Sequence, residues 1–216
     1  MTAMSGKRFR GFGEAVVDFY EGLEADNSKA YWTDNRAIYE AQVRAPMLDL
    51  LADLEPEFGA GKVFRPYRDL RFSPGREPYK TQCGATAGAN YVQVSADGLM
   101  VATGYYAMVP TQVARYRAAV DDDHRGPELA RIVTSLLNEG FTVAGQRLKT
   151  RPRGVSADHP RLDLLRHRSL YVWCSWPPAD DLHAPGLDER VADAWHRLAP
   201  LAEWLNAHVG VDIDEG

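Results

Sequence analysis

The sequence is poor in cysteine and has no long apolar run. Its two cysteines are Cys83 and Cys174, and each lies in a short apolar stretch that predicts a β-strand. A buried thiol is therefore the expected role of each, rather than a disulfide or a nucleophile. The longest uncharged stretch, residues 98–114, is interrupted by Gly104 and Pro110 and carries polar side chains. It does not predict a membrane-spanning helix.

Several sequence signals are absent as well. Residues 1–15 contain charges but no apolar run behind them, so they do not indicate a secretory signal, and we expect a cytoplasmic protein with no membrane partner. No Gly-x-x-x-x-Gly-Lys-Ser/Thr loop and no Gly-x-Ser-x-Gly elbow occurs, and residues 11–13 (Gly-Phe-Gly) have no strand before them. These absences argue against P-loop NTPases, α/β-hydrolases and dinucleotide-binding domains. No motif indicates a cofactor or a bound metal, and we expect neither.

What is present is an ordinary globular composition, with 45% hydrophobic and 25% charged residues and a net charge of -5. Positive charge is concentrated in two segments. Residues 61–80 have a balance of +4 and residues 144–168 a balance of +5, which leaves -14 for the rest of the chain. An acidic protein with two basic segments favours local anion sites over general coating of nucleic acid, which needs a broad positive field. A nucleic-acid partner is therefore not expected.

Hydrophobic spacing predicts helices and strands in separate groups. Helical spacing runs over residues 14–27, from Thr33 to Gly59 with an interruption at Pro46, and over 111–123, 127–140, 161–168 and 187–209. For the second of these helices, Asp34 and Asn35 are the expected caps. Strand-like patterns cover residues 62–72, 81–88, 91–108 with a turn at Asp97, 169–176, and a hairpin over 141–149. This grouping predicts an α+β fold, a single domain over residues 1–216 with a mainly antiparallel sheet and helices packed against it.

The first basic segment, "RPYRDLRFSPGREPYK", covers residues 65–80. In one regular strand, alternation would place Arg65, Asp69 and Arg71 on one face and Arg68 on the other. Pro66 cannot donate a ladder hydrogen bond, so we expect an edge strand or a bulge here, and the facing of Arg68 stays open. The planar guanidinium of arginine can donate two parallel hydrogen bonds to a carboxylate or a phosphate. An ion network around Asp69 that only fixes the sheet is the structural alternative.

This segment resembles the signature of an uncharacterised bacterial family, domain of unknown function 2461. The signature reads Arg-x-x-Arg-Asp-x-Arg-Phe, then Asp or Asn with Lys, and finally Tyr. The matching residues are Arg65, Arg68, Asp69, Arg71, Phe72 and Tyr79. Gly75 and Arg76 stand where the family has Asp or Asn and Lys.

The similarity extends over roughly residues 9–205. It includes residues 25–46, with Trp32, and the basic loop "LKTRPRGVSADHP" over residues 148–160. The resemblance implies no activity, but it implies one shared surface for three segments. The candidate ligand-binding residues are Trp32, Asn35, Arg36, Arg65, Arg68, Arg71, Arg76, Lys80, Lys149, Arg151 and Arg153. The candidates for proton transfer or orientation are Asp69, Tyr79 and His159.

The residues therefore indicate a binding chemistry rather than a reaction. We expect an arginine-lined pocket for an anionic small molecule that bears phosphate or carboxylate. One alternative is a non-enzymatic module that docks an acidic protein or RNA, and another is a purely structural arginine network. Asp69 and Glu77 with Lys80 have an unusual spacing for a metal-dependent nuclease. Residues 120–124 (Val-Asp-Asp-Asp-His) follow a predicted helix, where a solvated helix end is expected.

Overall fold

The computed structural model describes residues 8–69 and 77–210. The chain divides into two compact units, unit 1 (Met1–Val101 with Ser175–Ala194) and unit 2 (Ala102–Cys174 with Trp195–Gly216). Strands β4 (Gly98–Tyr105) and β6 (Leu170–Trp176) and helix α7 (Leu187–His208) run through both units. Because these elements are continuous in the chain, a single domain over residues 1–216 stays our prediction.

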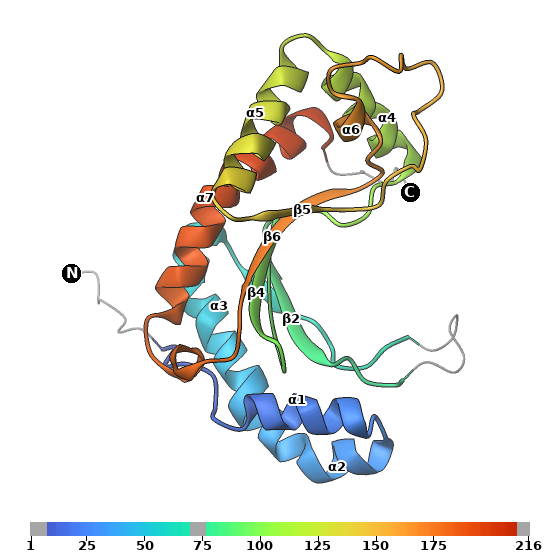
Figure 1. Cartoon of the computed structure of the whole chain (residues 1–216). Coiled ribbons are helices and arrows are strands. Elements are labelled where there is room, and N and C mark those ends of the chain that lie inside the picture. The colour runs from blue at the N-terminus through green and yellow to red at the C-terminus, as the bar shows by residue number, and fades with distance from the viewer. Residues whose placement is uncertain (1–7, 70–76, 211–216) are drawn as a thin grey trace, which may run out of the picture. The chain divides into compact units, whose positions relative to one another are not determined.

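The strands form one six-stranded sheet with the order β1-β2-β3-β4-β6-β5 (Figure 1). The other four strands are β1 (Gly61–Val63), β2 (Gln82–Ala87), β3 (Asn90–Ser95) and β5 (Thr142–Ala144). Strand β2 pairs antiparallel with both β1 and β3, and β5 pairs antiparallel with β6. The predicted α+β class with an antiparallel sheet and packed helices is confirmed.

In unit 1 the helices α1 (Val16–Ala25), α2 (Lys29–Ile38) and α3 (Ala45–Phe58) are joined by short connections. Helix α1 packs on α2, and α3 packs on β1 and β2. Helix α2 begins four residues before the predicted start at Thr33, because Ser28 caps it: the Ser28 hydroxyl oxygen accepts a hydrogen bond from the Tyr31 N–H at 3.1 Å. Asp34 and Asn35, the predicted caps, therefore lie inside the helix.

A π-helical segment, η1 (Tyr39–Arg44), joins α2 to α3. Pro46 in the first turn of α3 lacks the N–H that would bond the Gln42 carbonyl in a regular helix. That carbonyl instead accepts the Gly13 N–H at 3.0 Å, and the Gln42 side-chain oxygen accepts the Ala15 N–H at 3.0 Å. The backbone carbonyl and the side chain of Gln42 thus hold the segment before α1 against the helices.

Unit 2 contains α4 (Pro110–Asp121), α5 (Arg125–Asn138) and the short α6 (Leu162–Leu165). Helix α4 packs against both α5 and α6, and α5 packs against β5. The predicted hairpin over residues 141–149 does not form, because β5 pairs with β6 and Arg147 makes an isolated bridge with His167. Gly145 (φ 135°) lies directly against the Ser169 carbonyl, where a Cβ would clash with the oxygen. The absence of a side chain therefore lets this part of the chain lie alongside residues 167–171.

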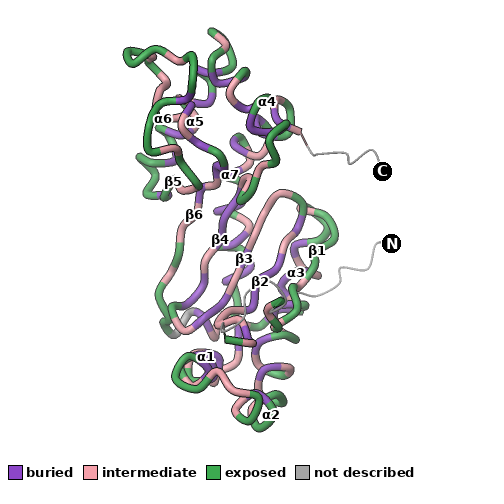
Figure 2. Tube along the Cα trace, turned by 90° about the vertical axis from the view of Figure 1, so that its right-hand side faces the viewer, coloured by how far each residue is buried: buried purple, intermediate pink, exposed green. Residues whose placement is uncertain are grey.

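The core lies along one side of the helices and along the strands, where Figure 2 shows buried residues interspersed with less buried ones. In unit 1 it includes Val92 and Val94 of β3 and Leu50 of α3, all fully buried. A 3₁₀ turn, η2 (Asp180–His183), precedes α7 and accepts the Phe12 N–H through the Leu182 carbonyl at 2.9 Å. No helix in residues 8–69 or 77–210 is long and apolar enough to span a membrane.

Candidate functional site

A short antiparallel ribbon carries the first basic segment in unit 1. Strand β1 ends at Val63, and beyond Pro66 the chain makes an isolated bridge between Tyr67 and Tyr79. The Arg68 N–H donates to the Pro78 carbonyl at 2.9 Å, and the Lys80 N–H donates to the Pro66 carbonyl at 2.8 Å. We call residues 64–69 and 77–80 the basic ribbon. The expected interruption at Pro66 and the edge position of β1 are both present.

The tyrosines of the basic ribbon pack on α2 through Trp32. The rings of Trp32 and Tyr79 are stacked, with centroids 4.6 Å apart and planes inclined by 11°, and the Tyr67 ring lies 5.8 Å from Trp32 and 5.4 Å from Tyr79. Asn27 fixes the backbone of Tyr79 from both sides, since its side-chain oxygen accepts the Tyr79 N–H at 2.9 Å and its amide donates to the Tyr79 carbonyl at 3.1 Å. The aromatic packing therefore holds the ribbon in one place.

Trp32 is 4% exposed. The stacked Tyr79 ring covers it, so it is not exposed to solvent, and its role in binding a ligand stays a prediction. Asn35 and Arg36 follow on α2: the Asn35 amide donates to the Tyr31 carbonyl at 2.9 Å within the helix, and Arg36 is exposed. Trp32 contacts the ribbon through the rings of Tyr67 and Tyr79.

Three cations of the basic ribbon influence one another electrostatically. Burial and then the positive charges of Arg65 and Arg68 lower the pKa of Lys80. The Lys80 ammonium lies 5.5 Å from the centre of the Phe64 ring, a cation–π arrangement. Arg68 is half-buried, and its guanidinium has no ion-pair partner in the described part of the chain. Arg68 thus lies near enough to Lys80 for the two positive charges to repel each other.

The ribbon also carries carboxylates. Arg65 and Asp69 approach to 4.0 Å, a distance at the limit of an ion pair, and their side chains are 68% and 34% exposed. Glu77 is exposed and forms no ion pair with another described residue. The role of Asp69 in orienting an arginine stays a prediction.

Tyr79, the second candidate for proton transfer, is 5% exposed. Burial, with a smaller effect of the neighbouring Tyr67, raises the pKa of its hydroxyl. It stays protonated at neutral pH and can donate a hydrogen bond but has no free negative charge to offer. Its proton-transfer role stays a prediction. Arg71 and Arg76 lie outside the described residues.

Unit 1 also holds a buried contact between a tyrosine hydroxyl and a thiol, which sequence reasoning missed. The Tyr39 hydroxyl donates to the Cys83 sulfur at 3.9 Å, and both residues are almost fully buried. Burial raises the pKa of the Cys83 thiol to about 11, while the charges of Arg44 and Lys80 act in the opposite direction. The thiol is therefore neutral, which agrees with the expected buried cysteine. No sequence spacing links Tyr39 to Cys83.

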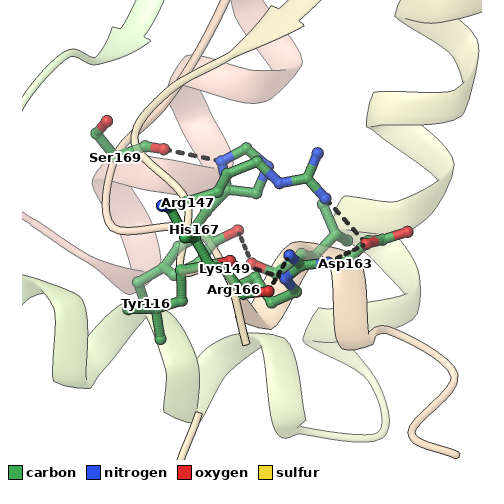
Figure 3. A network of polar contacts seen from close by, with 9 residues as sticks. Tyr116, Arg147, Lys149, Asp163, Arg166, His167 and Ser169 are labelled. Atoms are coloured by element: carbon green, nitrogen blue, oxygen red, sulfur yellow. Dashed lines mark hydrogen bonds and ion pairs between the residues drawn. The ribbon is translucent and has the colours of Figure 1, made fainter. Parts of the chain in front are cut away.

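The second basic segment, in unit 2, is tied to its own surroundings (Figure 3). Arg166 donates to the Leu148 carbonyl at 2.9 Å and to the Lys149 carbonyl at 2.7 Å. Asp163 accepts from Arg147 at 2.9 Å and lies 3.6 Å from Arg166. These contacts fix the start of the loop that leads from residue 149 to α6. Arg147 and Arg166 thus have structural contacts rather than open sites.

His167 lies beside this network and was not singled out by sequence reasoning. It is 3% exposed, and its Nδ1 lies 2.9 Å from the Ser169 carbonyl oxygen. Burial lowers the pKa of the imidazole most, and the charge of Arg147 lowers it further, against the opposing hydrogen bond to Ser169. His167 is therefore neutral near pH 7. Its position at the start of a buried strand between two arginines was the signal available in the sequence.

The far end of the loop is fixed to the end of α4. The His159 Nδ1 accepts the Arg161 N–H at 3.1 Å, and its Nε2 lies 3.1 Å from the Asp121 carboxylate. Arg161 donates to the carbonyls of Val120 and Asp121 at 2.7 and 3.0 Å. Because Nδ1 accepts, the ring proton lies on Nε2. Both ring nitrogens are thus occupied, and a proton-transfer role of His159 stays a prediction.

Between these two attachments, Lys149, Arg151 and Arg153 are exposed. Their side chains form no ion pair or hydrogen bond with another described residue. They belong to unit 2, whereas the basic ribbon belongs to unit 1. The single surface that would join them stays a prediction.

Comparison with known proteins assigns the chain to a protein family. The family described as "Conserved hypothetical protein (DUF2461)" matches residues 15–204, so the chain belongs to it. No curated protein and no solved structure matches the chain. Within residues 8–69 and 77–210, no group of three or more His, Cys, Asp or Glu side chains is placed to hold a metal ion.

Proposed function

We propose that unit 1 binds an anionic small molecule, bearing phosphate or carboxylate, on the basic ribbon. Arg65, Arg68 and Lys80 are the residues that would contact it. The observation that carries the proposal is the clustering of these three cations beside Asp69 on a ribbon that stacking holds rigid. The positive charges of Arg65 and Arg68 lower the pKa of Lys80, which shows that the three repel one another, and an anion between them would remove the repulsion.

The chemistry of the side chains fits such a ligand. A guanidinium such as that of Arg68 can give two parallel charge-assisted hydrogen bonds to a phosphate or carboxylate. Lys80 would add a single point charge. The Tyr67–Tyr79 bridge and the Trp32 stack hold the backbone of the ribbon, so little backbone freedom would be lost on binding.

Thermal unfolding with added anions tests the proposal. The wild type should show a rise in the melting midpoint of several degrees with sulfate, phosphate or a dicarboxylate at about a hundred times the dissociation constant, which adds roughly 2.7 kcal/mol. Arg68→Ala should lose the shift. Lys62→Ala, which removes an exposed cation from the neighbouring β1, should keep it.

Two results would contradict the proposal. One is the absence of a shift with every anion in a folded wild type. The other is an equal shift in wild type and Arg68→Ala. A strong loss of stability in Arg68→Ala without any ligand response would instead support the structural reading of the arginines.

A second candidate function rests on the unit 2 loop. Lys149, Arg151 and Arg153 are exposed between two fixed attachments, which favours docking of an acidic protein surface. Binding of poly-glutamate should weaken strongly between about 0.05 and 0.2 M salt, since it depends on several exposed charges. The double variant Arg151→Ala/Arg153→Ala should lose this binding, and equal binding by wild type and variant would contradict the candidate.

A further inference from the structure

Exposed aromatic rings are concentrated at the basic ribbon. The large hydrophobic side chains that are exposed in the described part of the chain include three aromatic residues, Phe64, Tyr67 and Tyr106. Two of these three lie within the six residues that also contain Arg65 and Arg68. Single exposed apolar residues need no explanation. Two aromatic rings interleaved with cations form a pattern typical of surfaces that bind nucleotides.

Tyr67 is the exposed end of an otherwise buried aromatic stack. Its side chain is 44% exposed, whereas Trp32 and Tyr79, against which it packs, are 4% and 5% exposed. The ring lies 5.4 Å from Tyr79 and 5.8 Å from Trp32, and its backbone is held by the bridge to Tyr79. One side of a fixed tyrosine ring is therefore available to solvent.

Phe64 is held in a similar way. It is 36% exposed, lies at 6.3 Å in a stacked orientation on Tyr91, and has the Lys80 ammonium 5.5 Å from its ring centre. Its ring already has a cation and an aromatic neighbour. Tyr67, whose described ring contacts are all with buried aromatic residues, is therefore the better platform for a planar ligand group.

We infer that the anion bound by the basic ribbon is a mononucleotide, with its phosphate on Arg65, Arg68 and Lys80 and its base stacked on Tyr67. This inference rests on the proposed anion site and specifies its ligand. A single nucleotide is favoured over a nucleic-acid strand because the chain outside its two basic segments carries a charge of -14, which repels a long polyanion.

Three probes separate the contributions of phosphate and base. Binding of adenosine monophosphate, ribose 5-phosphate and adenosine is measured by calorimetry at one salt concentration. Because stacking of one base contributes substantially, adenosine monophosphate should bind roughly 5- to 150-fold more tightly than ribose 5-phosphate. Tyr67→Leu should remove this difference, which is read as the ratio of the two affinities measured on the same variant. Tyr67→Phe, which keeps the ring, should retain the difference.

Each outcome decides between the two proposals. Equal binding of adenosine monophosphate and ribose 5-phosphate by the wild type would overturn the nucleotide inference while the anion site stands. No binding of either phosphate would overturn both. A preference that persists in folded Tyr67→Leu would overturn the stacking on Tyr67. Tighter binding of a thymidine oligonucleotide than of adenosine monophosphate would overturn the choice of a mononucleotide.

Discussion

Two buried donors of unit 1, the Tyr20 hydroxyl and the Trp32 indole N–H, have no hydrogen-bond acceptor among the described residues. Leaving such a group unpaired costs roughly 1–3 kcal/mol. Burial raises the pKa of Tyr20, with additional effects of Cys83, Tyr39 and Tyr91, so its hydroxyl keeps its proton. The unpaired group at Tyr20 is therefore a neutral hydroxyl, and replacing tyrosine by phenylalanine removes its energetic cost.

Tyr20→Phe should leave the free energy of unfolding unchanged or raise it by about 1 kcal/mol, because it removes the unpaired hydroxyl and keeps the buried ring. Urea denaturation measures the change. The control is Tyr39→Phe, which removes the donor to Cys83 and should lower stability by about 0.5–1.5 kcal/mol. A loss above about 1 kcal/mol in Tyr20→Phe would show that its hydroxyl is paired in solution.

The lowered pKa of Lys80 predicts a pH dependence for the proposed anion site. Lys80 loses its proton at a lower pH than an exposed lysine because of its burial and the charges of Arg65 and Arg68. Anion binding uses the protonated form, so the affinity for sulfate, whose charge is constant here, should fall as the pH rises toward the lowered pKa. Titration calorimetry over a pH series measures this. Lys80→Arg, which stays protonated, should bind without the fall, and the same fall in both proteins would contradict the assignment.

At this scale the sequence identified side-chain types but not their surroundings. The cations of the ribbon and the buried, neutral Cys83 could be predicted from charge and apolar context. The burial of Trp32 could not, because it depends on Tyr79, which lies 47 positions away in the chain and stacks on it. Likewise, the pairing of His159 with Asp121 depends on where the loop meets α4.

The start of helix α2 depends on Ser28, and its replacement tests that element. Ser28→Ala should lower the free energy of unfolding by about 1 kcal/mol, because the N–H at Tyr31 loses its acceptor. Ser28→Asp keeps an acceptor at the cap and should retain most of the stability. Urea denaturation of the three proteins is the measurement. Equal stability of Ser28→Ala and the wild type would mean that the cap contributes nothing here.

Local signals predicted the elements well where propensity and packing agree. Helix α7 (Leu187–His208) and strand β6 (Leu170–Trp176) lie within a residue of their predicted ranges. The hairpin over residues 141–149 was wrong, since pairing with a distant strand depends on tertiary contacts that a local pattern does not contain. The π-helical form of Tyr39–Arg44 was also not predicted, although Pro46 marked its place.

At the scale of the whole molecule, grouped helices and strands were sufficient to predict the α+β class. The division into two units was not predicted, because hydrophobic spacing reports which residues are buried but not which core they enter. The shared surface of the basic ribbon and the unit 2 loop, which the family resemblance implied, stays a prediction.

The elements shared by the units make a prediction about cooperativity. Strands β4 and β6 and helix α7 each continue from one unit into the other, so unfolding one unit would break hydrogen bonds in elements that the other requires. We therefore expect one two-state transition, in which the calorimetric enthalpy of unfolding equals the van't Hoff enthalpy. Scanning calorimetry measures both quantities.

The variants Leu50→Ala in unit 1 and Leu129→Ala in unit 2, each at a fully buried position, should lower the same single midpoint, since each leaves a cavity that costs about 2–5 kcal/mol. Two separate transitions, with each variant shifting only one of them, would show that the units unfold independently and that residues 1–216 form two domains.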